Sequence, residues 1–254
     1  PEKIRTVIKS RLKDMETSVE EALSENWDGK ISVDHTSSMS EYLEKGNPLS
    51  GKFIFNAARI SMSVASYNSC MGRIVAAPTA GSCGIIPGIL FSWEKYFQED
   101  REKMIDALIT AAGTGEIIAE RATLAGAEGG CQAECGAAAA MAAASLVFLR
   151  KGTPSQVAEA AALAIKSIMG LVCDPVAGLV EVPCIKRNGA LVSLAGIAAD
   201  MALAGVKSII PPDEVIDAMS SVGKSLPVTL KETALGGVAM TPTGKKLSGK
   251  VEKE

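Results

Sequence analysis

Three of the six cysteines in this 254-residue chain stand in settings where a thiolate can bind a metal. Cys131 follows Gly129-Gly130 at the start of an Ala-rich helical pattern, where the partial positive charge of a helix N-terminus favours the thiolate. Cys173 follows the end of another helical pattern, and Cys184 comes after ten further residues, which lets the loop return to the same metal. No two of these cysteines have the two-residue spacing of zinc ribbons or ferredoxins. The alternative interpretation is therefore that all three are small buried hydrophobic residues.

Three protein thiolates fit one particular type of metal centre. An iron-sulfur cubane needs four iron ligands, and if the protein supplies three, the fourth iron stays open to act as a Lewis acid on substrate oxygen atoms. Cys135 lies one helical turn after Cys131 but already inside the Ala-rich helix, so we expect a buried thiol there. Cys70 and Cys83 are predicted to be buried thiols in the same way.

A glycine-containing loop at residues 78–84, Pro-Thr-Ala-Gly-Ser-Cys-Gly, runs into a predicted helix start at Ile85. Its exposed backbone N–H groups, together with the hydroxyls of Thr79 and Ser82, can hold a carboxylate. The loop lacks the Gly-Lys-Ser/Thr ending of a Walker loop and the glycine spacing of a Rossmann turn, which disfavours nucleotide binding. A turn that only joins two helices is the alternative.

Other groups suited to acid–base chemistry are few. His35 is the single histidine, and its place in an irregular segment favours a surface or loop role. Lys186 and Arg187 follow Cys184 and can neutralise a cluster or a carboxylate, although solvated loop cations fit equally well. Four glutamates lie near the glycine loops, where a solvated or structural role is the common one for each: Glu116, Glu120, Glu128 and Glu134.

Helices are the elements predicted to position these groups. Aromatic residues make up only 4% of the chain and apolar residues 47%, many of them alanine, which favours closely packed helices over a sheet. Apolar residues recur three or four apart over 2–27, whereas 28–51 shows no period and is predicted to be irregular. Further helices are predicted at 53–72, 102–124, 131–150, 154–169, 192–204 and 212–222, and the end from residue 241 as a solvated tail.

Composition also excludes several classes of protein. A net charge of −3 without a basic run that includes aromatic residues argues against a nucleic-acid partner. The longest apolar stretch, 137–149, is shorter than the roughly 20 residues that cross a bilayer, so we expect a core helix and no membrane partner. The first residues show no apolar signal region, which predicts a cytoplasmic protein whose cysteines are free thiols or metal ligands.

Three segments together resemble the iron-sulfur-dependent L-serine dehydratases. They are residues 76–87, Ala-Ala-Pro-Thr-Ala-Gly-Ser-Cys-Gly-Ile-Ile-Pro; residues 128–132, Glu-Gly-Gly-Cys-Gln; and residues 173–184, Cys-Asp-Pro-Val-Ala-Gly-Leu-Val-Glu-Val-Pro-Cys. The resemblance extends over about 50–246 and includes the ending Leu-Gly-Gly-Val-Ala-Met-Thr-Pro-Thr-Gly at 235–244. The long motif that joins its two cysteines is highly specific to this family.

The resemblance implies an all-α catalytic domain, built around the Ala-rich helix, whose Gly- and Pro-rich loops hold a 4Fe-4S cluster on Cys131, Cys173 and Cys184. Cys135 falls outside that set. The implied reaction removes water from L-serine without pyridoxal phosphate, and the loop at Thr79, Gly81 and Ser82 is the candidate for holding the substrate carboxylate. The implied organisation is an N-terminal helix and connection at 1–51, the catalytic domain at 52–246 and a polar tail at 247–254.

One departure from the family concerns a missing motif. Single-chain members carry a second domain with a Ser-Ser-Ser-His-Thr-type substrate motif, whereas His35-Thr36 here follows Asp34. The resemblance therefore implies a separate beta subunit that supplies the missing part, with the catalytic base not assigned, and it leaves room for a homo-oligomer. Two alternative functions stay open: a relative on the same scaffold that removes sulfide from cysteine, and a non-enzymatic helical module that a metal such as zinc holds together.

Overall fold

All of the regular structure is helical in the computed structural model of the chain, which describes residues 2–252. Within that part of the chain there are eleven α-helices and no β-strand, as the composition predicts. Short 3-10 or π segments, labelled η, occur in the loops. The α-helices are α1 (Glu2–Ser24), α2 (Thr36–Lys45), α3 (Gly51–Ser69), α4 (Ile85–Phe97), α5 (Arg101–Arg121), α6 (Gly126–Gly129), α7 (Ala137–Leu149), α8 (Pro154–Ser167), α9 (Cys184–Leu203), α10 (Pro212–Ser225) and α11 (Pro242–Val251).

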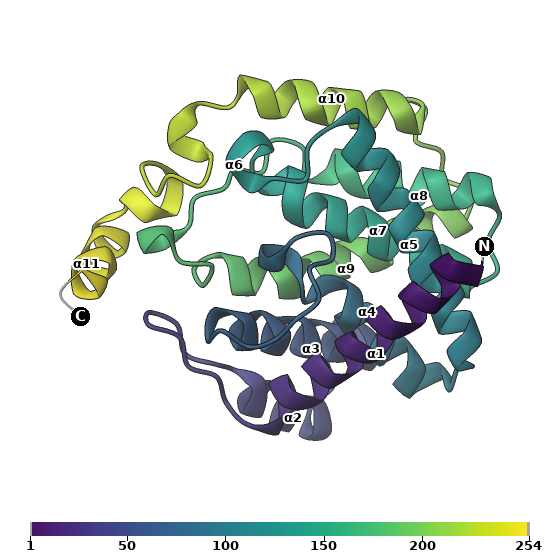
Figure 1. Cartoon of the computed structure of the whole chain (residues 1–254), viewed down its shortest axis with the longest axis horizontal. Coiled ribbons are helices and arrows are strands. Elements are labelled where there is room, and N and C mark those ends of the chain that lie inside the picture. The colour runs from purple at the N-terminus through teal and green to yellow at the C-terminus, as the bar shows by residue number, and fades with distance from the viewer. Residues whose placement is uncertain (1, 253–254) are drawn as a thin grey trace.

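The Ala-rich helix α7 is the centre of a single helical domain, as predicted. It packs against α5, α8, α9 and α4, and Figure 1 shows it surrounded by these helices. Nearly every side chain of α7 is buried, and the alanines allow the neighbouring backbones to approach closely. The apolar stretch Gln132–Leu149 is long enough to span a membrane, but 89% of it is buried inside the protein. It is therefore the core helix that the sequence predicts.

Helices α1 to α4 form a second group at the lower side of Figure 1. Helix α3 packs against both α4 and α9, and Gly189 of α9 permits one close approach, because a Cβ there would lie 2.6 Å from Met62 Cγ. Inside the α3–α4 contact, Asn56 donates a hydrogen bond from Nδ2 to Ser92 Oγ at 3.0 Å. Asn56 and Ser92 are both fully buried.

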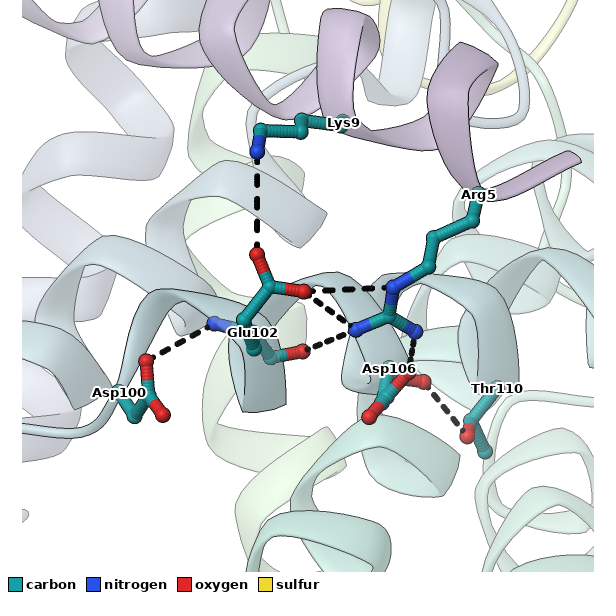
Figure 2. Close-up of polar contacts among 6 residues, drawn as sticks. All are labelled: Arg5, Lys9, Asp100, Glu102, Asp106 and Thr110. Carbon is teal, nitrogen blue, oxygen red and sulfur yellow. Dashed lines mark hydrogen bonds and ion pairs between the residues drawn. The ribbon is translucent and has the colours of Figure 1, made fainter. Parts of the chain in front are cut away.

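Helix α1 lies along α3 and α5 and contacts α5 through a set of surface ion pairs (Figure 2). Arg5 reaches two carboxylates on α5: its Nη2 lies 2.7 Å from Glu102 Oε2, and its Nη1 contacts Asp106. Lys9 Nζ is 3.8 Å from the other oxygen of Glu102. The N-terminus of α5 is capped by Asp100, whose side chain accepts a hydrogen bond from the Glu102 backbone N–H at 3.1 Å.

Two helices lie where the sequence analysis predicts none. The segment expected to be irregular contains α2, a polar helix that buries only Thr36 and Leu43. Helix α4 follows the glycine loop, and its first nine residues, Ile85 to Trp93, are buried on all sides, whereas only its last turn is partly exposed. Pro87 fits this helix because it stands in the first turn, where its missing N–H costs no helical hydrogen bond.

Two helix boundaries also differ. Helix α9 begins at Cys184 rather than near residue 192, since Asn188 and Gly189 are buried although their residue types suggest a loop. The end from residue 241 is largely exposed, as the sequence predicts, but it forms the helix α11, which packs against η3 (Val176–Gly178). Thr241 caps α11 by accepting a hydrogen bond from the Gly244 N–H at 3.1 Å. Residues 253–254 of the predicted tail, like residue 1, lie outside the described residues.

Candidate functional site

The three cysteines predicted to bind a metal come from three different segments and face one region. Cys131 precedes η2 (Gln132–Gly136), Cys173 lies in the loop after α8, and Cys184 is the first residue of α9. All three are buried, with 2%, 4% and 8% of their surface exposed. Burial raises the pKa of Cys184 to about 12, and it raises the pKa of Cys173 further; in both cases the nearby Cys131 charge adds to the shift. The three thiols therefore interact electrostatically.

Cys131 has the surroundings of a thiolate. The hydrogen bond from the Cys135 thiol lowers the pKa of Cys131, and the charge of Arg187 lowers it further against the opposing effect of burial. Gly130 allows the chain to turn directly before Cys131, because its φ of 78° is strained for any other residue type. The Sγ atoms of Cys131 and Cys135 and a carboxylate oxygen of Glu134 all lie within 4.8 Å of one another.

Cys135 is buried, as predicted, but its thiol faces Cys131. Residues three and four positions after Cys131 share its side of a helix, which explains why Glu134 and Cys135 both reach it. The compact group of possible donors thus differs from the predicted set of Cys131, Cys173 and Cys184. The i, i+3 spacing from Cys131 is the sequence signal that distinguishes Glu134 from the other three glutamates, which are all exposed: Glu116, Glu120 and Glu128.

Gln132 connects the Cys131 turn with the segment that leads to Cys173. Its side chain is fully buried, and its Nε2 donates to the carbonyl oxygens of Gly129 at 2.9 Å and Met219 at 3.1 Å. Its Oε1 accepts from the Gly170 N–H at 2.8 Å. Because these partners lie in α6, in α10 and in the loop after α8, one amide side chain fixes the positions of two cysteine-bearing loops.

The backbone of Cys173 is paired with a C-terminal segment. Its N–H donates to the Leu230 carbonyl at 2.9 Å, and its carbonyl accepts from the Glu232 N–H at 2.8 Å. Three non-glycine residues nearby have positive φ: Ala177 at 57°, Glu232 at 63° and Ala234 at 55°. Such backbone conformations are strained and occur often at functional sites.

Arg187 is the cation of this region, whereas Lys186 is exposed. Arg187 donates from Nη1 to the Val172 carbonyl at 2.9 Å and from Nη2 to Asp174 Oδ1 at 2.8 Å. The other oxygen of the buried Asp174 accepts from the Val238 N–H at 2.8 Å. Arg187 also contacts Cys131, so a single guanidinium links the helix after Cys184 to the loops of the other two cysteines.

Glu181, between the two cysteines of the long motif, holds the N-terminal connection against that loop. Its side chain is only 2% exposed. Its two oxygens accept from the N–H groups of Lys30 and Ile31, each at 3.0 Å, and from both the N–H and the hydroxyl of Ser32, each at 2.9 Å. A Cβ on Gly29 would lie 2.3 Å from Glu181 Oε2, so glycine is required for the close approach.

The glycine loop holds a carboxylate that belongs to the protein. Thr79 donates from Oγ1 to Glu134 Oε1 at 2.5 Å, and the Thr79 and Ser82 hydroxyl oxygens are 3.0 Å apart. Burial raises the pKa of Glu134, while its hydrogen bond with Thr79 opposes the shift. Asn188 attaches the loop to α9 by donating to the Gly81 carbonyl at 2.7 Å and accepting from the Gly84 N–H at 3.1 Å.

The residues around the thiols fit an iron-sulfur cluster in donor type. Thiolates are the ligands that iron-sulfur clusters prefer. Gly126 lets the Glu134 carboxylate and the Cys173 thiol approach its backbone closely, because a Cβ there would lie 3.1 Å from Glu134 Oε2 and 3.2 Å from Cys173 Sγ. A surface pocket of about 680 Å³ lies elsewhere, between α1 and residues 73–76, and none of the cysteines lines it.

The remaining candidate residues lie outside this group. His35 precedes α2 and is exposed, in agreement with the predicted surface role. Cys83 is buried, whereas Cys70 is half-exposed and donates from Sγ to the Asp28 carbonyl at 3.3 Å, so the prediction of a buried thiol is wrong for Cys70. All six cysteines are free thiols.

Comparison with known proteins adds an independent finding. Residues 1–239 match the family described as serine dehydratase alpha chain. The probable L-serine dehydratase alpha chain of Bacillus subtilis is 51% identical over 213 residues, which cover 84% of this chain and 71% of that protein. The L-serine dehydratase alpha chain of Peptoniphilus asaccharolyticus is 49% identical over 207 residues, which cover 82% of this chain and 71% of that protein. The L-serine dehydratase of Helicobacter pylori is 40% identical over 213 residues, or 80% of this chain but only 46% of that protein.

Proposed function

The chain belongs to the serine dehydratase alpha chain family, and from this premise we propose that it is the catalytic alpha subunit of an iron-sulfur L-serine dehydratase. The proposed reaction is the loss of water from L-serine. A base removes the α-proton and the β-hydroxyl leaves, which gives an enamine; the enamine then takes up water and releases ammonia, leaving pyruvate. All six cysteines are free thiols, which supports the reducing cytoplasm as the location.

One observation carries the proposal of a 4Fe-4S cluster: three buried thiols from separate loops face one region beside Gly126 and Arg187. Cys131, Cys173 and Cys184 are the residues that would hold the cluster. When bound, the cluster supplies an iron without a protein ligand, which acts as a Lewis acid toward the hydroxyl and carboxylate of the substrate. The positive charge of Arg187 offsets part of the negative charge that three thiolates bring into a buried site.

The glycine loop at Thr79, Gly81 and Ser82 is the proposed carboxylate site for L-serine. Support comes from Glu134, since the Thr79 hydroxyl already donates to a carboxylate there. A Cβ on Gly81 would lie 2.5 Å from Glu134 Oε1, so glycine keeps this position open for a carboxylate. The substrate carboxylate takes over the same donors while Glu134 moves aside. A Thr79→Ala variant then shows a raised KM for serine, Thr79→Ser restores it, and unchanged serine kinetics in Thr79→Ala contradict the assignment.

The cluster is tested by anaerobic reconstitution of the purified chain with iron and sulfide. The parent develops a broad visible charge-transfer band, and a Cys173→Ser variant treated identically does not. Cys70→Ser is the matched control, because Cys70 is half-exposed and bonded to the Asp28 carbonyl, outside the thiol group. If parent and Cys173→Ser take up equal iron and acid-labile sulfide, Cys173 is not a ligand.

The proposal includes a beta subunit as partner. Two of the relatives are named as alpha chains. The Helicobacter pylori relative is not named as an alpha chain, and this chain matches only 46% of its length. The partner supplies substrate-binding groups that this chain lacks. His35, its single histidine, is exposed and takes no part in the thiol group.

A further inference from the structure

A second polar pocket lies among α2, α3 and α4, on the side of the molecule where Figure 1 shows the first helices. Its volume is about 280 Å³. None of the cysteines lines it, and it contains neither Glu134 nor the glycine loop, so the proposed reaction makes no use of it. The polar groups that line it are Ser40, Glu44, Lys52, Arg59, Lys95 and Tyr96.

The pocket is positively charged although the whole chain carries a net charge of −3. Three cations, Lys52, Arg59 and Lys95, face one carboxylate, Glu44, which leaves a formal charge of +2. Within residues 2–252, none of these three cations forms an ion pair. The neighbouring Lys45 does form one, because its Nζ lies 2.7 Å from Glu41 Oε1. The positive charge of the pocket is therefore not neutralised by the chain itself.

Arg59 is the half-buried member of the group, and its hydrogen bonds are incomplete. Its Nη1 donates to Ser40 Oγ at 3.2 Å and its Nη2 to Asn56 Oδ1 at 3.1 Å, and both acceptors are neutral. Its Nε is buried and has no acceptor among the described residues. Burial lowers the pKa of Arg59, which reflects the cost of holding an unpaired charge there. A buried guanidinium of this kind is stabilised when an anion pairs with it.

We propose that the pocket among α2, α3 and α4 binds a phosphate group, either as free phosphate or as the phosphate of a small metabolite. A phosphate group carries a charge of about −1.5 to −2 near neutral pH, which matches the +2 of the lining. Lys52 and Lys95 are exposed at the rim, where they can close over the anion, and the hydroxyl of Tyr96 can donate to one of its remaining oxygens.

The test measures binding of inorganic phosphate to the full chain by calorimetry, with sodium chloride adjusted to constant ionic strength. We expect saturable binding, and affinity about tenfold weaker in a Lys52→Gln, Lys95→Gln double variant, because two of the three cations are lost. These two side chains are exposed, so the variant is expected to fold. Lys45→Gln is the matched control, since it removes one positive charge from α2 outside the pocket and should bind phosphate like the parent.

Three outcomes decide the proposal. Absence of saturable binding to the parent, or equal binding by the parent and the double variant, overturns it. Acetate that binds as tightly as phosphate also overturns it, because the pocket then selects only for negative charge. Tighter binding of glycerol 3-phosphate than of inorganic phosphate supports a metabolite as the ligand, and the reverse order supports the free ion.

Discussion

Glu181 connects two distant parts of the chain at the scale of a single residue. It belongs to the motif that joins Cys173 and Cys184, yet all four hydrogen bonds that its carboxylate accepts come from residues 30–32. A buried carboxylate with several donors is strongly stabilising only while its charge and its donors are both present. The carboxylate therefore fixes the cysteine loop and the N-terminal connection together.

Replacing Glu181 with Gln should destabilise the fold, because an amide NH₂ would face N–H donors in a site with little exposure to water. We expect the free energy of unfolding in urea to fall by about 3 kcal/mol. We also expect less iron to be retained after reconstitution, since the loop between two of the proposed ligands loses its support. Glu128→Gln is the control at an exposed position. Equal unfolding midpoints for Glu181→Gln and the parent would contradict the role of Glu181.

Cys70 and Cys83 should differ sharply in reactivity. Burial raises the pKa of Cys83 to about 12, so only about one molecule in ten thousand carries the thiolate at pH 8. Cys70 is half-exposed and accessible to reagents. Iodoacetamide at pH 8 should modify Cys70 and leave Cys83 intact in the folded protein, as read by peptide mass spectrometry. In urea both thiols should react. Similar rates for the two thiols without urea would contradict the prediction, because Cys83 would then be accessible to the reagent in the folded protein.

Residue types and spacing predict part of the site and miss the rest for a physical reason. The glycines before Cys131 and the length of the motif from Cys173 to Cys184 are local features, and they lead to the three thiols that the fold brings together. The partners of Glu181, Gln132 and Arg187 lie on other segments. Nothing near them in the sequence identifies those partners, because the contacts exist only after the chain has folded.

At the scale of elements, a helix was easiest to predict where one of its faces meets water. Helix α1 shows a clear period because its apolar side packs on α3 and α5 while its charged side is solvated. Helix α4 is harder to predict, since its first nine residues are buried on all sides and include Pro87 and Gly88. A Cβ on Gly88 would lie 2.6 Å from the Ala57 carbonyl oxygen, so close packing on α3 accounts for a residue that otherwise suggests a loop.

Attachment of α1 should depend on its apolar side rather than on the ion pairs of Figure 2. Leu12 is 3% exposed and belongs to the main core, so Leu12→Ala should lower the free energy of unfolding by about 3 kcal/mol. Arg5→Ala removes exposed ion pairs, which water and salt already screen. Its unfolding midpoint should therefore stay close to that of the parent at physiological salt. If Arg5→Ala is the more damaging variant, the ion pairs are what hold α1 in place.

For the molecule as a whole, apolar side chains gather in the segment that borders the thiols. Residues 228–240 pair with the backbone of Cys173 and donate a hydrogen bond to its neighbour Asp174. Four of their large apolar side chains are nevertheless exposed: Val228 at 70%, Leu235 at 61%, Val238 at 40% and Met240 at 42%. Exposed apolar groups close together often mark a surface that another protein covers. In the proposed enzyme, that protein is the beta subunit.

The purified chain should therefore bind its cluster but reach full serine turnover only with the beta subunit. A Leu235→Asp variant should develop the same visible band as the parent, because Leu235 is exposed, and should need more beta subunit for half-maximal activity. Ile4→Asp is the control, because Ile4 is 61% exposed on α1, and the start of α1 lies on the opposite side of Figure 1 from the C-terminus. Full turnover by the single chain would refute the need for a partner. If Leu235→Asp needs no more beta subunit than the parent for half-maximal activity, residues 228–240 are not part of the contact surface.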